Sequence, residues 1–167
     1  PPLVGAIDEL TGDYLVWLDA RERPEHRALP SLLAQLRYDQ VGLVGGVTVR
    51  RGIILQSGLV VGEDGQPHHA FAGLPDLPQR NFYLNLKDLV REVSAVAPGC
   101  AMRRETWREL GGWRADLPPA LALADLALRA AEHHARATLL SPLARFARRG
   151  PLAPLPDVAG HAWPWRG

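Results

Sequence analysis

The sequence predicts an α/β domain built on a mixed β-sheet with flanking helices. Uninterrupted apolar runs of strand length alternate along the chain with segments of helical periodicity, which is the pattern of an α/β sheet. Residues 41–49 and 53–61 are predicted to be two strands, and the Arg50-Arg51-Gly52 turn between them suits a hairpin. Because a hairpin pairs its strands antiparallel, the sheet should be mixed rather than purely parallel.

Bulk composition narrows the class of protein. The 167 residues suffice for one domain with a real core, and 47% hydrophobic against 22% charged residues argues against a disordered chain. The net charge of +1 gives no reason to expect a nucleic-acid partner. Cys100 is the single cysteine, so no disulfide framework is possible, and no apolar run approaches the roughly 20 residues of a membrane span. No signal peptide opens the chain, and we expect a soluble cytoplasmic domain.

The N-terminal third should contain a helix, a strand and a second helix. Residues 4–10 predict a short helix. The apolar run at 14–18 predicts a strand that ends on Asp19; because it does not alternate, we expect both of its faces to be covered, as in the middle of an α/β sheet. The next helix should run from Pro30 to Arg37, with one apolar stripe made of Leu32, Leu33 and Leu36.

The rest of the domain alternates in the same way. Residues 62–80 are rich in Gly, Pro, Asp and His and predict a long loop. The elements after it are a strand at 93–97, a short helix at 105–110 stopped by Gly111-Gly112, the longest helix at 121–135 and a strand at 137–140. The domain should therefore span residues 1–150. Residues 151–167 form a Pro/Trp-rich tail, a linker or a docking segment; docking is preferred because Trp163 and Trp165 are costly to leave in water.

Six short segments, taken in chain order, match the motifs of a known family. They are residues 12–20 (GDYLVWLDA), 42–46 (GLVGG), 54–60 (ILQSGLV), 93–104 (VSAVAPGCAMRR), 109–113 (ELGGW) and 126–129 (LALR). Over about residues 4–145 the chain thus resembles the C-terminal half of an inverting family-two glycosyltransferase of the rhamnosyltransferase or O-antigen type. The resemblance implies a Rossmann-like GT-A fold and transfer of a sugar from a nucleotide-sugar donor to a glycan or other acceptor. It also implies bacterial cell-surface polysaccharide biosynthesis.

The resemblance places the donor diphosphate, with its metal, just after the first strand. Members of the family hold Mg²⁺ or Mn²⁺ there with an Asp-x-Asp pair, and the metal neutralises charge on the leaving nucleotide. Here the pair reads Asp19-Ala20-Arg21, so a guanidinium stands where a hard cation needs an oxygen ligand. Glu22 could replace the lost ligand, or Arg21 could itself neutralise the diphosphate. A lost metal site is preferred over both alternatives, and no metal or other cofactor is expected.

The family's general base lies at the start of the long helix. Aligning the helix on Arg129 places Leu123 at that position, and leucine cannot accept a proton. Asp125 matches the family's second carboxylate, which supports the chemistry rather than performing it. Asp125 is therefore the one candidate catalytic residue, although a structural or capping role is preferred for it.

The resemblance also indicates residues that would bind the acceptor. The segment that lines the acceptor pocket corresponds to Gly99, Cys100 and Ala101, and a histidine-bearing hairpin loop corresponds to His68 and His69. The two histidines either contact the acceptor or belong to a polar loop with no binding role, and the second interpretation is preferred.

Near the place where the family often carries a histidine beside the metal, this chain has the basic cluster Arg145, Arg148 and Arg149. A solvated patch is preferred for these arginines, with phosphate contact as the alternative. Cys100 is expected to be a small buried residue and not a nucleophile.

The first half of the family's fold has no counterpart in these residues. Family members begin with βαβ units that hold the nucleotide base, whereas here the matching motifs start near residue 12. We therefore expect a partial GT-A fold that lacks the N-terminal nucleotide-binding strands and is inactive on its own. The alternative is a non-catalytic module that keeps the fold to bind a sugar, a nucleotide or a protein. In either case the strand at 14–18 would have a bare edge that something should cover. A homodimer is the preferred solution, and a missing N-terminal half or the Trp163-Pro164-Trp165 tail folding back are the alternatives.

Overall fold

The computed structural model describes residues 7, 9–62, 66–76, 89–114, 117, 119–152 and 154–155. The strands are β1 (Tyr14–Trp17), β2 (Glu22–Pro24), β3 (Val41–Arg50), β4 (Ile53–Gln56), β5 (Leu59–Val61), β6 (Pro67–His69), β7 (Arg91–Glu92), β8 (Cys100–Arg103) and β9 (Ala137–Arg148). The helices are α2 (Ala28–Gln35), α3 (Arg104–Glu109) and α4 (Pro119–His134). Most of the helix predicted at residues 4–10, and the tail with Trp163 and Trp165, lie outside the described residues.

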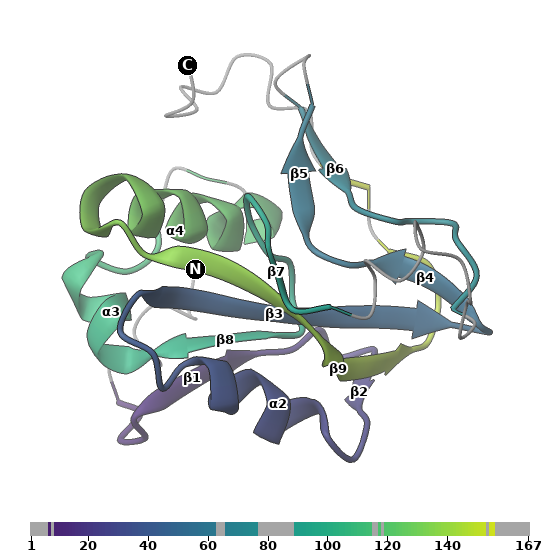
Figure 1. The fold of residues 1–167 in the computed structure, drawn as a ribbon, viewed down its shortest axis with the longest axis horizontal. Coiled ribbons are helices and arrows are strands. Elements are labelled where there is room, and N and C mark those ends of the chain that lie inside the picture. The colour runs from purple at the N-terminus through teal and green to yellow at the C-terminus, as the bar shows by residue number, and fades with distance from the viewer. Residues whose placement is uncertain are drawn as a thin grey trace.

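Seven strands form one mixed sheet, as predicted. Its main order is β1-β8-β3-β9-β2, with β4 paired to β3 and β7 paired to β9. Within the described strands, β3 and β9 are the parallel pair and every other pair is antiparallel. β5 and β6 form a separate two-stranded sheet, which extends away from the main one (Figure 1).

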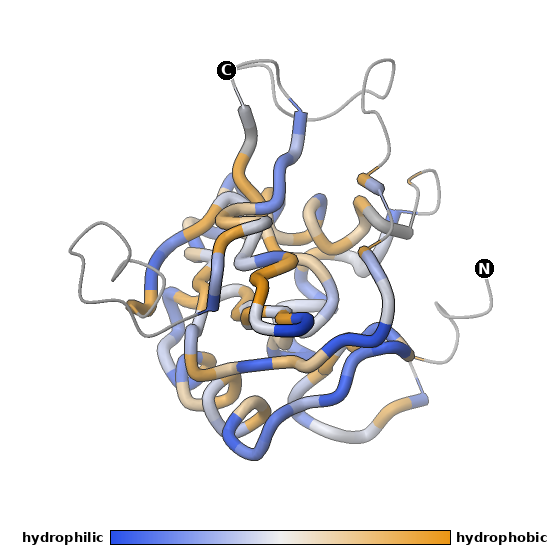
Figure 2. The backbone as a smooth tube through the Cα atoms, turned by 90° about the vertical axis from the view of Figure 1, so that its right-hand side faces the viewer, coloured by the Kyte–Doolittle hydropathy of each residue, from blue (hydrophilic) through white to orange (hydrophobic). Residues whose placement is uncertain are grey.

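Helices cover both faces of the sheet and bury two separate cores. On one face α2 packs Leu32 and Leu36, both fully buried, against Val44 and Phe146. On the other face α4 packs apolar side chains such as Leu126 over β3 and β9, and α3 packs on β8 and adds Trp107 to the same core. Figure 1 shows α4 and α2 on opposite sides of the sheet, and Figure 2 shows hydrophilic residues mostly along the periphery of the fold. The predicted leucine stripe is thus confirmed, although α2 begins two residues earlier than expected and leaves Leu33 only partly buried.

The hairpin between β3 and β4 forms where the sequence predicted it. Arg50 pairs with Ile53, and the two residues between them have positive φ angles, 50° at Arg51 and 75° at Gly52. Two consecutive positive φ angles are the signature of a type I′ turn, which matches the twist of antiparallel strands. The second strand of the hairpin is broken, however, because Ser57 and Gly58 separate β4 from β5.

Two segments have a different secondary structure from the one predicted. The predicted loop at 62–80 contains β6, which pairs antiparallel with β5, and the Gly62 N–H donates to the Gln66 carbonyl at 2.9 Å. The predicted strand at 93–97 is irregular apart from a single bridge between Leu59 and Ala95, and the regular strand here is β8. Val93 and Val96 are nevertheless buried, so that apolar run signals burial rather than strand pairing.

The strand β1 lies at the end of the strand order and pairs only with β8 among the described strands. The expectation that both of its faces are covered is wrong for this chain: Leu15 is 4% exposed, but Tyr14 and Val16 are 39% and 40% exposed. The reason is that α2 packs over β3, β8 and β9 and stops short of β1. In the described part of the chain, no helix is long and apolar enough to cross a membrane.

Candidate functional site

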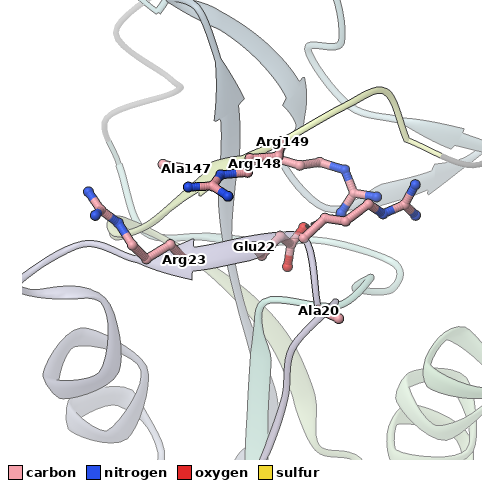
Figure 3. Close-up of a pocket in the computed structure, with 7 residues that line it drawn as sticks. Ala20, Glu22, Arg23, Ala147, Arg148 and Arg149 are labelled. Carbon is pink, nitrogen blue, oxygen red and sulfur yellow. Dashed lines mark hydrogen bonds and ion pairs between the residues drawn. The ribbon is translucent and has the colours of Figure 1, made fainter.

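The residues predicted to hold the donor diphosphate lie where β1 leads into β2. Asp19 follows β1, Arg21 occupies the turn, and Glu22 begins β2. β2 pairs antiparallel with the end of β9, with Glu22 opposite Arg148. This register brings Arg148 beside Glu22 (Figure 3), and the Arg149 backbone N–H donates to the Arg21 carbonyl at 3.0 Å.

Asp19 is bonded to two guanidinium groups. Its Oδ1 accepts hydrogen bonds from the Arg21 backbone N–H at 2.9 Å and from Arg21 Nε at 3.2 Å. Its Oδ2 accepts from Arg21 Nη2 at 3.2 Å and from Arg148 Nη2 at 3.0 Å. The Arg21 side chain, helped by Arg148, holds the pKa of the Asp19 carboxyl well below its usual range, although partial burial opposes the shift. Asp19 is therefore a carboxylate whose two oxygens are both engaged by cationic donors.

Glu22 and Arg148 form a buried ion pair beneath Asp19, with each side chain 1% exposed. Arg148 Nη1 donates to Glu22 Oε1 at 3.2 Å, and the Thr48 hydroxyl donates to the same oxygen at 3.1 Å. Gln56 Nε2 then donates both to Thr48 Oγ1 at 3.0 Å and to the Pro98 carbonyl at 2.8 Å. Burial raises the pKa of Glu22, and the bonds from Thr48 and Arg148 act against that rise. A continuous polar network thus runs from Asp19 to the Pro98-Gly99 turn.

These residues do not suit a divalent metal ion. A hard cation needs several oxygen ligands, but Arg21 replaces the second carboxylate of the motif and both oxygens of Asp19 already accept bonds from arginines. Glu22 Oε1 faces Arg148 and Thr48, and Glu22 Oε2 is buried without a hydrogen-bond partner. Within the described ranges, no three His, Cys, Asp or Glu side chains lie close enough together to hold a metal.

A pocket of about 390 Å³ opens at this point of the molecule. Its lining is made of Ala20, Arg21, Glu22, Arg23, Ala147, Arg148 and Arg149. Four guanidinium groups therefore face a single lining carboxylate.

The three arginines predicted as one basic cluster, Arg145, Arg148 and Arg149, lie at two separate places in the structure. Arg145 lies on β9 but forms ion pairs with Glu25 and Asp76, away from the pocket residues. Arg148 and Arg149, three and four residues later, join Asp19 and Arg21. Sequence reasoning did not anticipate the bond between Arg148 and Asp19, because that bond depends on the register of β2 against β9. It also passed over Arg23, which no motif distinguishes.

The two residues considered for the general base lie in the interior. Leu123 is 4% exposed and belongs to the main core. Asp125 is fully buried, and its Oδ2 accepts from Arg129 Nε at 2.8 Å. Arg114 Nη1 lies 3.9 Å from its Oδ1, and Arg129 also donates to the carbonyls of Leu110 and Gly112 after α3. These contacts support a structural role for Asp125, namely tying α4 to the end of α3, and a catalytic role for it stays a prediction.

The predicted acceptor residues do not lie together. The side chains of Cys100 and Ala101 are fully buried and point into opposite cores, so only the backbone near Gly99 could face a ligand. Burial strongly raises the pKa of the Cys100 thiol, which agrees with its expected role as a small core residue. His68 and His69 lie on β6 and line a different pocket of about 560 Å³, together with residues of β4 and with Pro151, Leu152, Pro154 and Leu155. Burial lowers the pKa of His69, whose Nδ1 has no hydrogen-bond partner.

Comparison with known proteins identifies the fold. No family model matches this chain, and no curated protein matches its sequence. Its structure is similar to that of GalNAc-T7, a glycosyltransferase of GT-A fold solved with UDP, GalNAc and Mn²⁺. The TM-score is 0.62 at 19% identity, and the match covers 88% of this chain but 29% of GalNAc-T7. The chain therefore has a GT-A-like fold, as its motifs implied, and it spans less than a third of the structure that it resembles.

Proposed function

We propose that this chain is a glycosyltransferase-like domain, related to enzymes that transfer a sugar from a nucleotide-sugar donor, and that it does not catalyse transfer by itself. The GT-A-like fold supports the first part. The observation that carries the second part is the pair of guanidinium groups on Asp19, from Arg21 and Arg148, where the family would place a divalent cation. The motifs additionally favour an inverting family-two ancestor of the O-antigen type in the bacterial cytoplasm, with a domain boundary near residue 150.

Sugar transfer demands two things that these residues do not provide. The leaving diphosphate needs its growing charge neutralised, and the acceptor hydroxyl needs a base; a positioned base typically contributes 10²–10⁴-fold to a rate. Leu123 occupies the expected base position and is part of the core. Asp125 is fully buried, and its carboxylate is bonded to Arg129.

We expect no nucleotide release when the chain is incubated with UDP-sugars or dTDP-sugars, with or without Mn²⁺. Release of UDP or dTDP is followed by a coupled enzyme assay over hours, with buffer alone as the reference. Asp19→Asn is the matched control, since it keeps the shape of the side chain and removes its charge. Turnover by the native chain that disappears in Asp19→Asn would show that the site is catalytic and that the proposal is wrong.

The second candidate function is a non-catalytic binding module. The observation that favours it is the exposed, arginine-lined pocket beside a site with no apparent base. A sugar, a nucleotide or a protein could be the ligand of such a module, and the pocket's charge favours an anionic one.

A homodimer is also part of the proposal, and it is argued from the edge of the sheet. β1 carries Tyr14 and Val16 on its exposed face, followed by Leu18 at 44% exposure, and β8 is its one partner among the described strands. The strand has no proline or inward charge of the kind that protects natural sheet edges. Two-fold pairing of β1 with its copy would cover this edge, and so would a strand from another segment paired to β1.

At micromolar concentration we expect the chain to sediment as a dimer, and Val16→Lys to sediment as a monomer, because a lysine at the centre of β1 places like charges opposite each other. Leu143→Lys is the control, since Leu143 is 60% exposed on β9 and should leave the dimer intact. A native monomer whose outward-facing β1 amides exchange rapidly with solvent would contradict the dimer.

A further inference from the structure

A second pocket, of about 340 Å³, lies at the beginning of β9 and is bordered by α4, β5 and β7. Figure 1 shows β7 between α4 and β5. The pocket lies far from the site around Asp19, since Thr138 is near the start of β9 and Arg148 is the last residue of that strand. None of the residues predicted to bind a donor or an acceptor belongs to its lining, which consists of Val60, Glu92, Val93, Ser94, Leu128, Ala131 and Thr138.

Thr138 places a buried hydroxyl without a partner in this pocket. The residue is 3% exposed, and its Oγ1 has no hydrogen-bond partner among the described residues. Thr138 is paired with Leu43 of β3, which belongs to the core beneath α4, so its side chain lies on the α4 face of the sheet. A buried hydroxyl that makes no hydrogen bond costs free energy, and a ligand that bonds to it would remove that cost.

The other two polar residues of the lining also carry side-chain oxygens. Glu92 is exposed and Ser94 is half-buried. In the part of the chain that the structure describes, neither side chain forms a hydrogen bond or an ion pair. No lysine, arginine or histidine is among the described residues of this lining. The pocket thus offers three oxygen-bearing side chains, one of them a carboxylate, and no cation.

Aliphatic side chains make up the rest of the lining. Val93 and Leu128 are buried, whereas Val60 is 41% exposed and Ala131 is exposed. Burial of a hydrocarbon chain against these side chains is favourable, because it removes apolar surface from water. A ligand that suits the whole lining therefore has a short aliphatic body and a polar head that bonds to oxygen atoms.

We propose that this pocket binds a primary aliphatic ammonium group, supplied either by a small amine or by a lysine side chain of a partner. An ammonium has three N–H donors and no acceptor, which matches the oxygens of Glu92, Ser94 and Thr138. Its charge is complementary to that of Glu92, the charged residue of the lining. The volume lies at the lower end of the usual range for small-molecule sites, which suits a short chain. The inference goes beyond the proposed function, because it involves no step of sugar transfer.

Three small probes with similar chains and different heads test the proposal. They are n-butylammonium, 1-butanol and butyrate, each titrated into the full chain at about pH 7, where the amine is protonated. Binding is followed by NMR of the methyl groups of Val60, Leu128 and Ala131. For n-butylammonium we expect a dissociation constant on the order of 1 mM, a realistic value for so small a ligand. 1-Butanol should bind about 10-fold more weakly, and butyrate should not bind.

Variants of two lining residues assign the binding to this pocket. Thr138→Val keeps the shape of the side chain and should weaken n-butylammonium about 10-fold, the effect of losing one hydrogen bond to a charged group. Thr138→Ser should retain the native affinity. Glu92→Gln should make n-butylammonium bind no more tightly than 1-butanol. Glu132→Gln is the matched control: it removes the same charge from α4 at a residue outside the lining, so affinity should change less than twofold.

Thermal melts distinguish a ligand site from a structural water. Thr138→Val should melt at or above the temperature of the native chain, because it removes a buried hydroxyl that has no partner in the unliganded chain. A less stable Thr138→Val protein, together with no binding of n-butylammonium, would show that a bound water satisfies the hydroxyl and would overturn the inference. Butyrate binding as tightly as the amine, or amine binding that both Thr138→Val and Glu92→Gln leave unchanged, would also overturn it.

A fourth probe, Nα-acetyl-lysine N-methylamide, identifies the source of the ammonium group. Affinity equal to that of n-butylammonium would support a lysine side chain of a partner protein, since the probe carries the flanking peptide groups. Affinity more than about 10-fold weaker would support a small free amine. Neither result depends on the turnover assay, because the pocket and the Asp19 site share no residue.

Discussion

Arg148→Ala should lower the free energy of unfolding by about 3–5 kcal/mol, the usual cost of removing one partner of a buried ion pair. The substitution leaves the buried Glu22 carboxylate and Asp19 without their shared cation. For a domain that is stable by only about 5–15 kcal/mol, the loss is a large fraction of the total. Urea denaturation followed by circular dichroism measures it, with an unchanged slope indicating that only stability has changed.

Two further variants separate this effect from a general loss of charge. Arg149→Ala removes the next arginine along the chain, which is exposed, and should change the unfolding free energy by less than about 0.5 kcal/mol. The triple variant Arg148→Met, Glu22→Gln, Asp19→Asn should recover much of the loss, because it removes the carboxylates together with their cation. An Arg148→Ala protein that loses less than about 1 kcal/mol would show that solvent replaces the ion pairs and that Arg148 does not anchor the site.

Asp125→Ala should have a comparable effect, again about 3–5 kcal/mol, because it leaves the largely buried Arg129 guanidinium without its carboxylate. The connection between α4 and the carbonyls of Leu110 and Gly112 should loosen at the same time. Asp125→Asn keeps a hydrogen-bond acceptor in the same place and should lose clearly less. The measurement is chemical denaturation of each variant under identical conditions.

The matched control for Asp125 is Glu132→Ala, which removes an acidic side chain from the same helix at 56% exposure. Its unfolding free energy should stay within about 0.5 kcal/mol of the native value. If Asp125→Ala were as stable as the native chain and instead abolished a measurable sugar-transfer activity, Asp125 would be a catalytic residue after all. The structural role argued from its contacts would then be wrong.

Local sequence signals determined a large part of the fold. The type I′ turn at Arg51 and Gly52, the glycines that end α3 and the leucine stripe of α2 all appeared in the sequence as turn or periodicity patterns. These features depend on residues a few positions apart, whose preferences are decided by sterics and local hydrogen bonding. The same signals, taken in order, indicated the GT-A-like fold that the structural comparison confirms.

These local signals did not predict how segments far apart in the sequence pair and pack. The run at 93–97 is apolar because it is buried, and burial alone does not distinguish a paired strand from an irregular segment. The exposed face of β1 likewise follows from where α2 ends in space, since the apolar run itself predicts cover on both sides.

The candidate site shows the same division between local and tertiary information. The sequence by itself determined that Arg21 replaces a carboxylate of the metal-binding motif. Only the tertiary structure decided that Arg148, 129 residues further along the chain, bonds to the remaining carboxylate of Asp19. Arg145 and Arg148 are both arginines and lie three residues apart on one strand. Arg145 nevertheless forms an ion pair with Asp76, and Arg148 forms one with Asp19. The register of β2 against β9 makes that choice, and register is a property of long-range packing that local sequence patterns do not contain.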